Sequence, residues 1–98
     1  MNRIWNGNDL QTSFREITRT KWIEFSNEKL FANFIFVEEN EDTVMLFDES
    51  RNLYVSLNSD NATCGDSKNL AAHYIFLNGK WLFQDTAPNN DTNNILIK

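Results

Sequence analysis

The chain has 98 residues, of which 41% are hydrophobic and 23% charged, and its formal net charge is −5. These are the proportions of an ordinary globular domain, and the length allows one hydrophobic core but not two, so we expect residues 1–98 to form a single β-rich domain. The negative charge disfavours nucleic acid as a partner, because an acidic surface repels phosphate backbones. No apolar run approaches the roughly 20 residues of a membrane span, so no membrane partner is expected.

The first predicted element, within residues 9–18, fits two structures. Leu10, Phe14 and Ile17 recur at spacings of four and three, which fits a short helix. A weak repeat that aligns Phe14 with Phe36, 22 positions later, instead favours a strand here. The sequence leaves helix and strand open.

Four apolar segments follow, separated by short breaks of Asn, Asp, Glu and Ser: residues 21–25, 30–37, 43–47 and 53–57. Segments of this length, rich in Phe, Val, Ile and Tyr, are typical of strands that hairpin turns join. They predict an antiparallel meander and an all-β fold.

The spacing of these segments also predicts a register. With turns centred on Asn40 and Ser50, Met45 faces both Ile35 and Val55. Both faces of the sheet are then apolar, so the second face must be covered by another layer, by a helix or by another chain. A small barrel or a two-layer sandwich is the simplest solution, and a homo-oligomer formed through an apolar face is the alternative. On this register we expect a largely buried group made of Phe34, Ile35, Met45, Phe47, Val55 and Leu57.

The last segments of the chain predict a further hairpin. Asn78 and Gly79 separate residues 74–77 from residues 81–83, and Asn-Gly between β-rich runs is typical of a type I′ turn. The polar stretch 85–94 predicts an exposed loop or tail, and residues 95–97 could return as an edge strand.

Side chains that could support catalysis or metal binding are scarce. A single cysteine, Cys64, excludes an intrachain disulfide, and with a single histidine, His73, the chain lacks the ligands of a zinc site. Cys64, His73 and Asp66 supply the residue types of a nucleophilic site, but they form no motif. We therefore expect no catalytic residue, no metal and no cofactor, and a protein that is not an enzyme.

Aromatic residues among polar neighbours give the functional hypothesis. Exposed rings can stack on sugar faces while nearby polar groups bind hydroxyls. If the turn at residues 26–29 closes symmetrically, Trp22 faces Asn33, with Glu24 on the same side. We therefore expect a non-catalytic recognition module that binds a saccharide or a similar polar ligand through Trp22, Glu24, Asn33 and Tyr54. The other interpretation places Trp22 and Tyr54 in the core.

A second hypothesis uses the acidic turns. Glu38, Glu41, Asp42 and Asp48 could make the domain a protein-binding module or an inhibitor of a basic protein partner. The first residues do not resemble a signal peptide, so a cytoplasmic location is expected unless a leader was removed.

Overall fold

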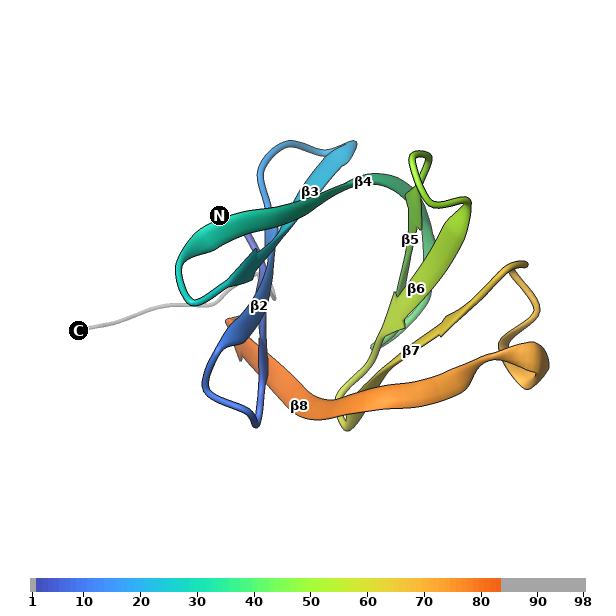
Figure 1. Cartoon of the computed structure of the whole chain (residues 1–98). Coiled ribbons are helices and arrows are strands. Elements are labelled where there is room, and N and C mark those ends of the chain that lie inside the picture. Colours follow the sequence, from blue (N-terminus) through green and yellow to red (C-terminus); the bar gives the residue numbers. More distant parts are fainter. Residues whose placement is uncertain (1, 84–98) are drawn as a thin grey trace.

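The computed structural model describes residues 2–83. These residues form eight antiparallel strands that pair in chain order and close into a barrel, with β1 against β8 (Figure 1). The prediction of an all-β meander is confirmed, and of the two predicted closures the barrel is the one formed. The strands are β1 (Ile4–Gly7), β2 (Thr12–Glu16), β3 (Lys21–Ser26), β4 (Lys29–Glu39), β5 (Val44–Asp48), β6 (Leu53–Leu57), β7 (Asn61–Gly65) and β8 (Tyr74–Phe83), and a 3-10 turn, η1 (Leu70–Ala72), precedes β8.

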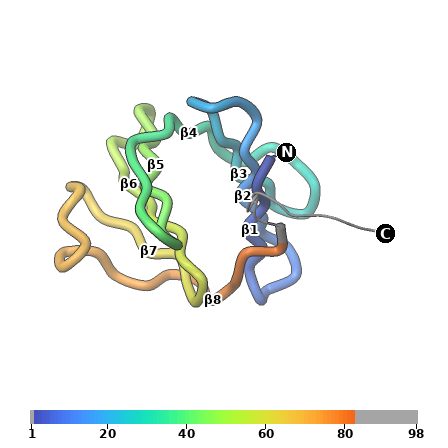
Figure 2. The backbone as a smooth tube through the Cα atoms, turned by 180° about the vertical axis from the view of Figure 1, so that it is seen from behind, coloured from blue at the N-terminus to red at the C-terminus, as the bar shows by residue number. Residues whose placement is uncertain are grey.

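Strands β4 and β8 are the longest, with 11 and 10 residues, and each pairs with different neighbours along its length. The first part of β4 pairs with β3 and the second part with β5. In the same way β8 pairs first with β7 and then with β1. Seen from behind, β1–β3 form one side of the barrel and β5–β7 the other, and β4 and β8 cross between them (Figure 2).

The core fills the barrel with large side chains from alternate strand positions. Trp5, Phe14 and Phe34 pack in a row, with ring centroids 6.0 and 5.6 Å apart, and all three rings are buried. Edge-on and tilted contacts of this kind are the favoured geometry of aromatic pairs. The sequence left helix and strand open for the segment around Phe14, and in the structure Phe14 is an inward-facing residue of strand β2.

The predicted register is wrong on both sides of β5. On the β4 side, Ile35 pairs with Phe47, and Met45 pairs with Glu38 beyond a bulge. On the β6 side, the register is wrong by one residue. Leu46 pairs with Val55, and Met45 pairs with Ser56. The turn spans the four residues between Asp48 and Leu53, so its centre lies half a residue beyond Ser50, and this shift exchanges the two faces of β6.

The predictions for the core are correct in part. Four of the six residues expected in the core are buried: Phe34, Met45, Val55 and Leu57. Ile35 is 42% exposed on the outer face, and Phe47, its partner in β5, is half-buried.

The predicted hairpin at Asn78 and Gly79 is also wrong, because β8 runs through both residues without a turn. Asn78 pairs with Asn61 of β7, and Gly79 pairs with Gly7 of β1. A Cβ atom at Gly79 would overlap the Trp5 ring and a backbone oxygen of β1, so the glycine allows close approach between the strands that close the barrel.

The tight turn with positive φ lies instead between β3 and β4. Asn27 and Glu28 adopt φ angles of 53° and 64°, which match a type I′ turn. Asn52, at the end of the β5–β6 turn, is likewise left-handed, with a φ of 54°. The expectations for residues 85–94 and 95–97 lie outside the described residues.

Candidate functional site

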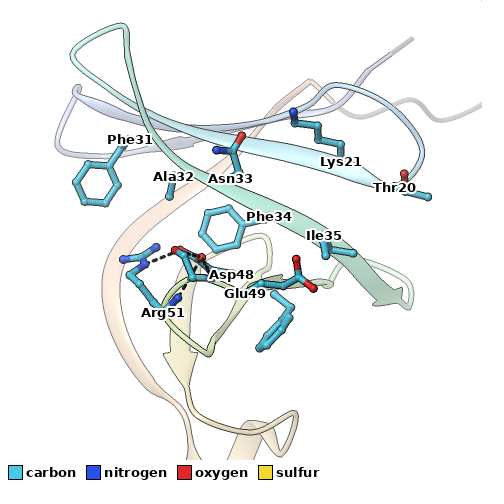
Figure 3. Close-up of a pocket in the computed structure, with 12 residues that line it drawn as sticks. Thr20, Lys21, Phe31, Ala32, Asn33, Phe34, Ile35, Asp48, Glu49 and Arg51 are labelled. Carbon is cyan, nitrogen blue, oxygen red and sulfur yellow. Dashed lines mark hydrogen bonds and ion pairs between the residues drawn. The ribbon is translucent and has the colours of Figure 1, made fainter.

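The barrel wall splits where β4 leaves β5. The ladder between them begins at Ile35, which pairs with Phe47, while the preceding residues of β4 pair only with β3. On the other side, the chain turns away after Asp48. A cavity of about 890 Å³ lies between the first half of β4 and the β5–β6 turn, and we call it the β4 cleft (Figure 3).

Apolar side chains line much of the β4 cleft. Phe31 is the most exposed of them, at 58%, and Ile35 and Phe47 line the cleft as well. Phe34 faces the barrel interior, and its ring lies between β4 and Asp48 in Figure 3. The cleft therefore offers accessible rings to a ligand, in a cavity of a size common for small-molecule sites.

Asp48 organises the polar wall of the cleft. It accepts hydrogen bonds from the backbone N–H of Ser50 at 2.9 Å, from the Ser50 hydroxyl at 2.7 Å, and from Arg51 Nε at 2.5 Å. Burial alone would raise the pKa of the Asp48 carboxyl, but these bonds and the Arg51 charge hold the pKa below its ordinary value. The hydrogen bonds also explain why the residues after Asp48 turn so sharply.

Arg51 lies at the centre of this arrangement. Besides its bond to Asp48, its guanidinium carbon lies 5.7 Å from the centroid of the Phe31 ring and 5.9 Å from that of Phe34. Its Nη2 atom lies 4.0 Å from the Oε1 atom of Glu24. One cation therefore faces two carboxyl groups and two aromatic rings.

Glu24 faces the barrel interior behind Arg51. Burial raises the pKa of its carboxyl to about 7; the charge of Arg51 opposes this shift, and those of Asp48 and Asp9 add to it. A carboxyl that titrates near neutral pH thus lies next to the cleft.

The four predicted site residues do not form one cluster. Trp22 is fully buried, so its expected exposure is wrong. It faces inward, pairs with Phe34 in place of Asn33, and packs edge-on against Trp81 at 6.2 Å. The two-residue turn between β3 and β4 closes as expected, with Ser26 opposite Lys29, but a β-bulge at Phe31 then shifts the register by one position, so Asn33 pairs with Ile23.

The other three predicted residues lie in or next to the β4 cleft. Asn33 lines the cleft directly. Glu24 does not line the cleft, but its carboxyl group faces the guanidinium of Arg51, which does. Tyr54 is half-buried on the outer face and stacks on the cleft residue Phe47 with a centroid distance of 4.5 Å.

Sequence reasoning missed most residues of the cleft, among them Lys21, Phe31 and Arg51. Their positions depend on where the β4–β5 ladder ends, and a strand pattern does not show that point. The only local signal was the Asp-x-Ser-Arg pattern of residues 48–51, which is typical of a turn closed by an aspartate.

The residues considered for nucleophilic chemistry have other partners. His73 Nε2 donates to the Ser67 carbonyl at 2.7 Å, and its Nδ1 atom forms a hydrogen bond of 2.9 Å with the Thr63 hydroxyl. The recorded hydrogen bonds of this ring join β7 to the loop before β8, and none of them reaches Cys64 or Asp66.

Most of the acidic residues of the second hypothesis have partners within the domain. Asp48 is buried against Arg51, which corrects its expected place on an exposed acidic surface. The Oε1 atom of Glu38 lies 3.8 Å from the Nζ atom of Lys68. The Asp42 carboxylate accepts hydrogen bonds from the hydroxyl groups of Thr43 and Ser59. Three of the four carboxylates thus already have partners within the domain.

No described helix is long and apolar enough to cross a membrane. Comparisons with protein-family models, with curated proteins and with solved structures found no match, so the evidence on function comes from the geometry of the β4 cleft.

Proposed function

We propose that the protein is a non-catalytic recognition module that binds a polar ligand with an apolar face, such as a saccharide, in the β4 cleft. The observation that carries this proposal is the exposed ring of Phe31 beside convergent polar groups. Stacking on the ring and hydrogen bonds at the edge of a ligand are the complementary contacts that such a site provides.

The charges of the β4 cleft favour a neutral ligand. Lys21 and Arg51 are balanced by Asp48 and Glu49, and the Arg51 charge is already taken up by Asp48. A strongly charged ligand would have to displace that pair, whereas hydroxyl or amide groups can bind to Asn33, Lys21 and Glu49 without breaking it.

A matched pair of variants tests the proposal. Leu30 and Phe31 are neighbours in β4 and both are 58% exposed, but only Phe31 lines the cleft. In a titration with the best-binding member of an array of neutral oligosaccharides, Phe31→Ala should weaken binding about tenfold, the upper end of what one aromatic contact contributes. Leu30→Ala should leave the affinity unchanged. Equal affinities of the two variants would show that the ligand does not bind in the cleft.

A further inference from the structure

We infer that the β4 cleft accepts an extended peptide segment of a partner, which pairs with the backbone of Asn33 and continues the interrupted β4–β5 ladder. This inference rests on the proposed function, because it names the class of ligand for the same cleft. It goes beyond the side-chain contacts described above, since the recognition groups are those of the main chain.

The direction of the backbone groups in β4 follows from one hydrogen bond. The Phe36 N–H donates to the Thr20 carbonyl at 2.9 Å, on the β3 side of the strand. Backbone groups of successive strand residues point to opposite sides, so those of Ile35 and Asn33 point toward β5. Ile35 has its partner there in Phe47.

Asn33 has no such partner. An antiparallel continuation of the ladder would place Glu49 opposite it, but Glu49 already belongs to the β5–β6 turn. Within residues 2–83, the N–H and C=O of Asn33 therefore face the cleft without a strand beside them. A free strand edge of this kind is a template for pairing with another chain.

The geometry of this pair selects the ligand. The two groups lie on the same side of one residue, and an opposing residue of an extended chain matches them with its own C=O and N–H. These come from two successive peptide groups. A single trans amide, such as the acetamido group of a sugar, directs its N–H and C=O in opposite directions and satisfies only one of the two.

The side chains around Asn33 fit the same occupant. Phe31 and Ile35 flank it on the outer face, and both are substantially exposed. Cross-strand contacts with such residues add to the backbone bonds when a peptide joins a sheet edge. A β-bulge at Phe31 interrupts the regular edge of β4, so Asn33 is the residue at which the peptide pairs with the main chain.

The test selects ligands for the full chain from a phage-displayed library of random hexapeptides, with an array of neutral oligosaccharides screened in parallel. The best peptide is then synthesised with capped ends, and also in a series with one N-methylated amide at each position. We expect one N-methylation to weaken binding about tenfold, because it removes the donor to the Asn33 carbonyl. Binding that no N-methylation weakens would overturn the inference.

Two variants probe the protein side. Asn33→Pro removes the N–H at the open edge, where proline is tolerated, and should also weaken peptide binding about tenfold. Asn33→Ala removes the side chain but keeps the backbone N–H, so it should weaken peptide binding less than Asn33→Pro does. If Asn33→Pro does not fold, the N-methylated peptides on the wild-type chain decide the question.

The outcomes separate this inference from the proposed function. Enrichment of oligosaccharides alone, with sensitivity to Phe31→Ala, would overturn the peptide inference and leave the recognition module standing. Enrichment of neither class would overturn both.

Discussion

The Nη2 atom of Arg51 lies 4.0 Å from the Oε1 atom of Glu24, so the cation at the cleft faces a carboxyl from the barrel interior. The Nε atom of the same guanidinium donates a hydrogen bond to the Asp48 carboxylate. The two carboxyl groups differ in their environment: Asp48 receives several hydrogen bonds, and within the described residues none is recorded to Glu24. Their pKa values are accordingly shifted in opposite directions.

Glu24 should make the stability of the domain fall as the pH rises. Its pKa is about 7 in the folded state against a reference of 4.5, so the folded state holds this proton more tightly than the unfolded state. The contribution to stability is full below about pH 4.5 and is lost between that value and pH 7. The loss should be on the order of 1–2 kcal/mol, less than the full shift implies, because water and Arg51 screen the charge.

Urea unfolding of the wild type and of Glu24→Gln measures this effect. The difference between their free energies of unfolding should change between pH 5 and pH 8 in favour of the variant, since glutamine does not ionise. A difference that stays constant over that range would contradict the raised pKa.

Asp48, in contrast to Glu24, should make the stability of the domain fall as the pH is lowered. Its folded-state pKa lies below the ordinary value of 3.8, so its contribution is present above that value and is lost as the pH falls through the folded pKa. Asp48→Asn should lower the free energy of unfolding at pH 7 by on the order of 1–3 kcal/mol, because a buried charge-assisted bond is removed. The two proteins should converge in stability as the pH falls through the folded-state pKa of Asp48, which acid titration of the circular dichroism signal would measure. Glu49→Gln, in the same turn but exposed, is the control and should leave the free energy of unfolding at pH 7 nearly unchanged.

The sequence predicted strands β3 to β6 well because their signal is local, but it did not predict β1 and β7, and it expected a turn within β8. Runs such as residues 53–57 alternate apolar and polar residues, and alternation alone identifies a half-buried strand. The pairing was less predictable, because one residue in a turn decides which face is inside. Asp48 and Asn52 set that turn, and their effect could be read only from the hydrogen bonds and φ angles.

The candidate site was predictable only in part for the same reason. Asn33 was predicted as the residue opposite Trp22; that pairing is wrong, but Asn33 does line the β4 cleft. Phe31 and Arg51 were not predicted, because they come together only where β4 and β5 separate. Gly79 was misinterpreted because Asn-Gly is a strong turn signal, whereas the glycine here serves the close packing of Trp5.

Gly79→Ala should destabilise the barrel at its closure. The new methyl group would overlap the Trp5 ring and the Asn6 carbonyl oxygen, neither of which can move easily, so we expect a cost of about 1–3 kcal/mol. The control is Gly7→Ala, whose methyl group would first meet the mobile end of the Leu77 side chain and should cost less. In the background of Trp5→Phe, a smaller ring, the cost of Gly79→Ala should shrink, as a double-mutant cycle of urea unfolding would show. Full additivity would mean that the Trp5 ring is not what the glycine accommodates.

The last prediction separates the two aromatic residues that were candidates for ligand binding. Trp22 is fully buried between Phe34 and Trp81, so Trp22→Ala should cost about 3–5 kcal/mol of stability through the cavity it leaves. The Nε1 atom of Trp22 is buried and has no hydrogen-bond partner among the described residues. Trp22→Phe should therefore cost much less, since it keeps a ring in the core and removes an unsatisfied donor.

Tyr54, unlike Trp22, lies on the outside of the barrel. Its ring packs on Phe47 at the outer face and is only half-buried, so Tyr54→Ala should cost about 1 kcal/mol of stability. Because Phe47 lines the β4 cleft, Tyr54→Ala should also weaken binding of a cleft ligand by a few fold, whereas Trp22→Phe should leave binding unchanged. Thermal unfolding and ligand titration of the three variants measure both effects. If Trp22→Phe lost ligand binding while the fold stayed intact, Trp22 would be a binding residue after all, and the β4 cleft alone would not account for binding.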